Sequence, residues 1–183
     1  VDVGRLTEEL DRAQARVSFL ILDACRNNPF EQRVRGAARG LAAVDAARGA
    51  SEVCIQGGIH PNKDGFWYRE IVRAIKRELP DLHIHAFSPE EIHFGQQKSN
   101  GMSLRDYLAM LRDEGLGTIP GTAAEILDDE IREILSPRKL STERWIEIVT
   151  TAHEVGLRSS STLMYGHIES AHHIARHFEI LRD

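Results

Sequence analysis

Short apolar runs alternate with longer segments of helical periodicity from about residue 52 to residue 181, and this alternation most constrains the fold. The run "EVCIQGG" ends in two glycines, and the next segment, "FWYREIVRAIKREL", has apolar residues at helical spacing. Strands that alternate with helices pair in parallel through right-handed crossovers. The pattern therefore predicts an α/β fold with about four strand–helix units, half of an eight-unit TIM-type barrel.

Three further units follow the first. We expect strands in "LHIHAF" (residues 82–87), in "LGTIP" (116–120) and in "LRSSSTLMYG" (157–166). Helices are expected over residues 103–114, 122–135, 142–155 and 169–181. The residues that follow parallel strands emerge on one rim of a barrel, which is where active sites lie. We therefore expect residues distant in sequence to converge there: Gly57, Gly58, His60, Ser88, Glu90, Glu91, Pro120, Gly121, Glu125, Tyr165, Gly166, His167 and Glu169.

Composition sets the class of protein. The 183 residues are 42% hydrophobic and 28% charged, and the net charge of -5 argues mildly against nonspecific binding to nucleic acid or anionic lipid. No apolar run is long enough to span a membrane. The two cysteines indicate a reducing, cytoplasmic setting. The chain begins at Val1 rather than Met, so we expect a fragment.

The stretch "ILDACRNNPF" places Cys25 at the end of an apolar run. Together with "RGLAAVDAARG" it resembles bacterial caspase-like peptidases over about residues 17–49, where this motif carries the nucleophile. A nucleophilic thiol needs a base, which in the caspase arrangement precedes it, but the first histidine is His60. We interpret Cys25 as a buried, unreactive thiol in a caspase-like partial segment, residues 1–49.

His83 and His85 lie two apart on a predicted strand and therefore face the same side. This spacing is used by barrel metallohydrolases, and His60 and His167 could add ligands. Those hydrolases also require a lysine at the end of a middle strand and an aspartate at the end of a late one, and both are absent. A metal-dependent barrel hydrolase remains the alternative, and no residue is assigned as a metal ligand.

From about residue 46 to residue 183 the chain resembles the radical S-adenosylmethionine enzymes of deazaflavin biosynthesis. Specifically, it is similar to the 4-hydroxyphenyl transferase subunit of the FO synthase system. The stretches that carry the resemblance are "ARGASEVCIQGGIHP", "HIHAFSPEEI", "MSLRDYLAMLRDEGLGTIPGTAAEIL", "PRKLSTERWIEIVTTAHEVGL" and "STLMYGHIE". The resemblance implies a truncated radical S-adenosylmethionine barrel over residues 50–183.

The resemblance also implies cofactors and partners. The family uses S-adenosylmethionine and a 4Fe-4S cluster, and it joins the hydroxybenzyl group of tyrosine to 5-amino-6-(D-ribitylamino)uracil. A partner subunit would complete deazaflavin synthesis, and neither nucleic acid nor a membrane is implied as a partner.

Site residues are carried over by position. Gly57 and Gly58 occupy the glycine slot for the methionyl amine, Glu125 is placed to bind ribose hydroxyls, and Gly166 and Glu169 match a motif that flanks the adenine. The catalytic candidates, chosen by rim position on the substrate side, are His60, His85, Tyr165 and His167.

One departure from the family is large. Its cluster is held by three cysteines spaced Cys-x-x-x-Cys-x-x-Cys, and this chain has only Cys25 and Cys54. We therefore expect this chain alone to be inactive. Our hypothesis is a chimera that joins two unrelated genes near residues 40–55, by recombination or an assembly error. An inactive chimeric fragment with a caspase-like leader is thus a further alternative.

Overall fold

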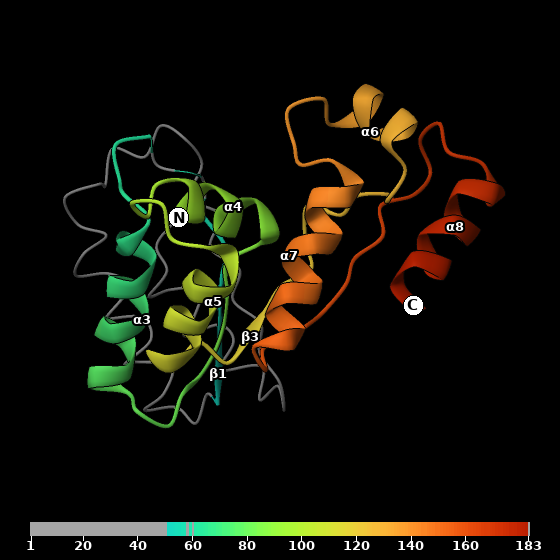
Figure 1. The fold of residues 1–183 in the computed structure, drawn as a ribbon. Coiled ribbons are helices and arrows are strands. Elements are labelled where there is room, and N and C mark those ends of the chain that lie inside the picture. Colours follow the sequence, from blue (N-terminus) through green and yellow to red (C-terminus); the bar gives the residue numbers. More distant parts are fainter. Residues whose placement is uncertain (1–50, 58, 60, 183) are drawn as a thin grey trace, which may run out of the picture.

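The computed structural model describes residues 51–57, 59 and 61–182, in which strands and helices alternate (Figure 1). In chain order the elements are β1 (Glu52–Ile55), α3 (Phe66–Glu78), β2 (His83–Ala86), α4 (Pro89–Gln97), α5 (Leu104–Asp113), β3 (Thr118–Ile119), α6 (Asp129–Leu135), α7 (Thr142–Glu154), β4 (Arg158–Ser159) and α8 (Ala171–Arg182). The predicted strands and most of the predicted helices are thus present. The caspase-like segment, with Cys25, lies outside the described residues.

The strands form one parallel four-stranded sheet in the order β1-β2-β3-β4. Each strand pairs with the next one along the chain, and the register sets Cys54 beside His85, His85 beside Thr118, and Thr118 beside Arg158. Sequential parallel pairing through helical crossovers is the arrangement of a barrel wall. The structure therefore confirms an α/β fold that fits part of a TIM-type barrel.

The two faces of the sheet differ in polarity. Side chains alternate between faces along a strand, so Ile84 and Ala86 point one way and His83 and His85 the other. Ile84 and Ala86 are fully buried against the helices, whereas the two histidines are half-buried. One face of the sheet therefore belongs to the hydrophobic core, and the opposite face is polar.

Helices α3, α5 and α7 cover the apolar face, and Figure 1 shows α3 and α5 near the sheet with α7 beside them. Tyr107 on α5 and Trp145 on α7 are almost completely buried in the core. Each also satisfies its polar atom, because Tyr107 Oη donates to the carbonyl of Gly65 at 2.9 Å and Trp145 Nε1 donates to that of Thr122 at 3.1 Å. No helix among the described residues is long and apolar enough to cross a membrane.

Helix α4 was not predicted. It begins at a capping box: the Ser88 hydroxyl accepts a hydrogen bond from the N–H of Glu91, and the Glu91 carboxylate accepts one from the N–H of Ser88. Pro89 occupies the first turn, where its missing N–H costs nothing. The Ser-x-x-Glu spacing in the sequence carried this signal.

The helix expected from residue 122 begins only at Asp129, so that part of the prediction was wrong. Ala123 and Glu125 have φ values of 59° and 43°, which a helix excludes. The buried guanidinium of Arg132 donates to the carbonyls of Ala123 and Ala124, which fixes the segment as a loop. Long-range hydrogen bonds thus override the helix propensity of "TAAEIL".

Candidate functional site

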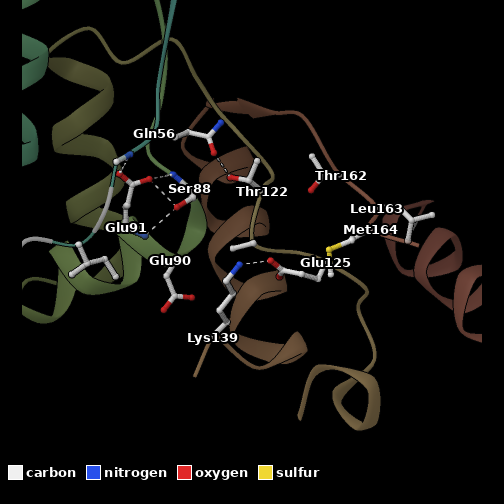
Figure 2. Close-up of a pocket in the computed structure, with 13 residues that line it drawn as sticks. Gln56, Ser88, Glu90, Glu91, Thr122, Glu125, Lys139, Thr162, Leu163 and Met164 are labelled. Atoms are coloured by element: carbon white, nitrogen blue, oxygen red, sulfur yellow. Dashed lines mark hydrogen bonds and ion pairs between the residues drawn. The ribbon is translucent and has the colours of Figure 1, made fainter. Parts of the chain in front are cut away.

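A cavity of about 530 Å³ opens at the carboxyl edge of the sheet (Figure 2). Its walls come from the segments that follow all four strands, as the barrel pattern predicts: Gln56, Gly57 and Ile59 after β1; Ser88, Glu90 and Glu91 after β2; Thr122, Ala123 and Glu125 after β3; Thr162, Leu163 and Met164 after β4; and Lys139 from the α6–α7 connection. This volume lies in the range of small-molecule sites.

Glu91 joins the first two segments. Its carboxylate accepts hydrogen bonds from the Gly57 N–H at 3.1 Å, from the Ser88 N–H at 2.9 Å and from the Ser88 hydroxyl at 2.8 Å. Burial raises the pKa of the Glu91 carboxyl above its ordinary value, although these three donors act in the opposite direction. Glu91 therefore sets the position of the chain at Gly57.

Glu125 is presented to the cavity by the β3–α6 loop. One carboxylate oxygen pairs with Lys139, and the other, Oε2, is buried and accepts no hydrogen bond. Arg132 Nη1 lies 3.7 Å from this oxygen, too far for a hydrogen bond. Glu125 therefore presents a carboxylate at the cavity wall, with one oxygen paired with Lys139 and the buried oxygen facing the guanidinium of Arg132.

Hydrogen bonds tie the last two segments together. The Gly121 N–H donates to the Ser160 hydroxyl at 3.2 Å, and the Met164 N–H donates to the carbonyl of Glu125 at 2.8 Å. A Cβ at Gly121 would lie 1.9 Å from the carbonyl oxygen of Ser160, so only glycine permits this approach. The glycine of "IPGTAAEIL" thus closes the wall between β3 and β4.

The side chains that line the cavity are acidic in balance. Glu90, Glu91 and Glu125 carry carboxyl groups, and Lys139 is the single cation among the lining residues that the structure describes. Lys139 is already paired with Glu125, and Glu90 accepts the Leu140 N–H at 3.1 Å. This distribution favours a ligand that bears positive charge.

The catalytic candidate His85 lies on the polar face of the sheet and outside the cavity lining. His85 Nδ1 is 2.7 Å from the hydroxyl of Thr118, and His83 Nε2 is 2.8 Å from the same oxygen. Burial is the main cause that lowers the pKa of His85. The two histidines of the predicted metal pair therefore share a hydroxyl partner.

The residues of the predicted motif after β4 lie outside the cavity lining. Tyr165 is 71% exposed, and Gly166 and His167 donate their backbone N–H groups to the carboxylate of Glu169. These bonds lower the pKa of Glu169, the one from Gly166 most strongly. None of the four residues lines the cavity, which Thr162, Leu163 and Met164 line instead. Gly58 and His60 lie outside the described residues.

Two residues of the site escaped the sequence analysis. Glu91 was placed on the rim without a role, although its capping-box spacing marked it as a fixed carboxylate. Arg132 is only 3% exposed and also donates to the carbonyl of Leu140 at 2.9 Å, so it joins the β3–α6 loop to the segment before α7. No local pattern in "DDEIREIL" distinguishes it from a surface arginine.

The described residues offer no cluster of metal-ligating side chains. Within the described part of the chain, no group of three or more His, Cys, Asp or Glu side chains could hold a metal ion. Cys54 is exposed and unpaired, and Cys25 is the one other cysteine in the sequence. The described residues thus fit neither the two-histidine hydrolase site nor an iron–sulfur cluster, which needs three or four thiolates.

Comparison with known proteins identifies the family. The Radical SAM superfamily matches residues 24–181, so the chain belongs to this superfamily. The match includes residues 24–49, which the sequence analysis placed in the caspase-like segment.

The chain is also similar to two particular proteins. The chain is 60% identical over 135 residues to a protein named FO synthase from Mycobacterium tuberculosis, an alignment that covers 74% of this chain and 16% of that protein. It is 47% identical over 142 residues to the 5-amino-6-(D-ribitylamino)uracil--L-tyrosine 4-hydroxyphenyl transferase of Methanothermobacter thermautotrophicus, covering 78% of this chain and 38% of that protein. The chain therefore spans well under half the length of these relatives.

Proposed function

We propose that this chain forms the S-adenosylmethionine-binding wall of a radical transferase that joins the hydroxybenzyl group of tyrosine to 5-amino-6-(D-ribitylamino)uracil. The observation that carries the proposal is the acidic cavity at the carboxyl edge of the sheet, in a chain similar to FO synthases. S-adenosylmethionine has a sulfonium and an ammonium against one carboxylate, so its net charge complements this lining.

Two lining residues suit this ligand. Gly57 has no side chain, so the ligand's methionyl part can approach the backbone that Glu91 fixes. The Glu125 carboxylate lines the cavity, and its Oε1, which Lys139 holds in place, can accept a hydrogen bond from a ribose hydroxyl. When bound, S-adenosylmethionine supplies the radical chemistry of this family. The placement of the adenine near Gly166 and Glu169, and the substrate-side roles of His60, Tyr165 and His167, stay predictions.

The cluster does not fit the residues of this chain. We propose that the thiolates needed for radical generation are not supplied here, so the chain alone binds the nucleotide without catalysis. Anaerobic reconstitution with iron and sulfide should then give none of the visible absorbance of an iron–sulfur cluster, because three or four thiolates are needed to hold one. Stoichiometric cluster formation would contradict this part of the proposal.

Calorimetry tests the binding proposal. We expect S-adenosylmethionine to bind more tightly than S-adenosylhomocysteine, which lacks the sulfonium charge, by about tenfold, or about 1.4 kcal/mol. Added salt should reduce this preference because it screens the carboxylates. Equal affinity for the two compounds, or no binding of either, would overturn the proposal.

The chimera hypothesis has a test of its own. We propose that residues 1–49 and 50–183 have separate origins, with the partner subunit of deazaflavin synthesis encoded elsewhere. Amplification and sequencing of the genomic locus across codons 40–55 tests this hypothesis. An uninterrupted native gene that contains both parts would contradict this hypothesis.

A further inference from the structure

A hydroxyl shared by two imidazole rings lies on the polar face of the sheet. Thr118 Oγ1 is 2.8 Å from His83 Nε2 and 2.7 Å from His85 Nδ1. A hydroxyl has one proton and two lone pairs, so Thr118 can donate to at most one ring and at least one of the two ring nitrogens must carry a proton. The geometry permits the tautomer in which His85 Nδ1 donates to Thr118 and Thr118 donates to His83 Nε2.

Gly117 makes room for the ring of His83. A Cβ at this position would lie 2.3 Å from Cε1 and 2.6 Å from Nδ1 of that ring, so a larger residue would displace the ring from where it lies. Thr118 is the next residue, and it pairs in register with His85. Gly117 and Thr118 thus hold the two rings by contact and by hydrogen bonding.

Glu52, His83 and His85 form a row along the sheet, from its amino edge toward its carboxyl edge. Glu52 begins β1 and pairs in register with His83, and its Oε2 lies 3.6 Å from His83 Nε2. The Glu52 side chain is 52% exposed. His85 is two residues nearer the carboxyl edge, where the cavity opens. The groups therefore lead from the neighbourhood of the cavity to solvent at the amino edge.

We infer that Glu52, His83, Thr118 and His85 form a proton relay that removes a proton from a substrate at the carboxyl edge of the sheet. The inference rests on the proposed function, because both proposed substrates carry amino groups and tyrosine also carries a phenol. It adds to the catalytic role predicted for His85 a path for the proton, through Thr118, and a final acceptor, His83.

The transfer balances without an added reactant. The substrate N–H or O–H bond breaks as a bond forms to His85 Nε2, the ring nitrogen that does not contact Thr118. The Nδ1 proton of His85 passes to Thr118 Oγ1, and the hydroxyl proton of Thr118 passes to His83 Nε2. His83 becomes an imidazolium whose charge is balanced by the Glu52 carboxylate.

Neighbouring groups suit a neutral His85 as the acceptor. Burial and the nearby His83 lower the pKa of His85, while the carboxylate of Glu52 raises it. The other ionisable side chains in this row are Cys54, beside His85 in register, and Arg158, beside Thr118. His85 thus starts as a free base, as an acceptor requires.

Nuclear magnetic resonance of histidine-labelled protein tests the relay. In the wild type, ring-nitrogen shifts should show complementary protonation at the two nitrogens facing Thr118, and each ring should respond to both steps of a pH titration because the two rings are coupled. Thr118→Val should leave each ring responding to a single step, whereas the matched control Thr118→Ser should behave as the wild type. Glu52→Gln should lower the midpoint of His85. Circular dichroism verifies that each variant is folded.

Identical titrations of the wild type and Thr118→Val would overturn the relay. Addition of S-adenosylmethionine and L-tyrosine should also shift His85 Nε2, and an unchanged signal while calorimetry records binding would overturn its role toward the substrate. The titration needs no ligand, so its result is separate from the proposed function. Loss of nucleotide binding with coupled rings would contradict only that function.

Discussion

The backbone N–H of Gly57 donates a hydrogen bond to the carboxylate of Glu91 across 3.1 Å, and these residues are 34 positions apart. A buried acid at the start of α4 therefore holds the chain that follows β1. The same carboxylate caps α4 through Ser88, so helix stability and the shape of the cavity depend on one side chain.

Glu91→Gln should weaken both functions of this residue. If the amide oxygen keeps the Ser88 contacts, the amide NH₂ faces the N–H of Gly57, and two donors then oppose each other. We expect the free energy of unfolding at pH 7 to fall by about 1–3 kcal/mol and nucleotide affinity to fall with it. Urea titration and calorimetry measure these effects, with the exposed Glu133→Gln as the control.

The raised pKa of Glu91 adds a pH signature. The folded state holds this proton more tightly than the unfolded state, so this group lowers stability as pH rises from its ordinary pKa of 4.5 through the raised pKa of the folded state. Glu91→Gln should remove this part of the pH dependence. A wild-type slope retained in the variant would show that another group causes it.

Gly57→Ala should separate folding from binding. A Cβ at Gly57 would lie 3.9 Å from Glu91 Oε1, an ordinary contact, so we expect little change in the free energy of unfolding. If a ligand approaches the backbone here, the added methyl group should reduce S-adenosylmethionine affinity at least tenfold, about 1.4 kcal/mol. Unchanged affinity in a folded variant would show that Gly57 does not contact the ligand.

Arg132→Gln should be strongly destabilising. The guanidinium donates to carbonyls of Ala123, Ala124, Ile126 and Leu140, and its loss leaves these buried acceptors without partners. We expect a loss of about 3 kcal/mol in urea titration. Arg132→Lys keeps the charge but lacks the planar fork, so it should recover only part of this stability. Full recovery would show that charge alone matters.

His177 should make the attachment of α8 sensitive to acid. This residue is fully buried, and its Nδ1 accepts the N–H of Leu127 at 3.0 Å. Burial, and to a smaller extent the charge of Arg132, lower the pKa of His177 below its ordinary value of 6.5. The unfolded state therefore binds the proton first, and stability should fall as pH drops from 6.5 through the folded pKa.

His177→Asn tests this sensitivity, because the asparagine oxygen can replace Nδ1 as the acceptor. We expect the variant to lose less stability than the wild type between pH 7 and pH 5 in urea titrations. The exposed His172→Asn on the same helix is the control and should keep the wild-type slope. Equal slopes in all three proteins would contradict the role of His177.

The sequence was most informative where local pattern and fold agree. Strand–helix alternation predicted the sheet, and the convergence of residues after each strand placed Gly57 and Glu125 on one cavity. The prediction failed at residues 122–128, where Arg132 imposes a loop on a helix-forming sequence. It could not show that Met164 lines the cavity and Tyr165 does not, because the direction of each side chain depends on how the chain leaves β4.

The order β1-β2-β3-β4 also bears on how the protein is made. Among the described strands, β2, β3 and β4 each pair with the strand synthesised just before them, so the sheet can grow on the ribosome in step with translation. Sequential pairing limits the loop closed at each addition to one helical crossover, and the entropy of loop closure grows only slowly with loop length. Emergence of β2 would then complete the first pair before the later helices exist.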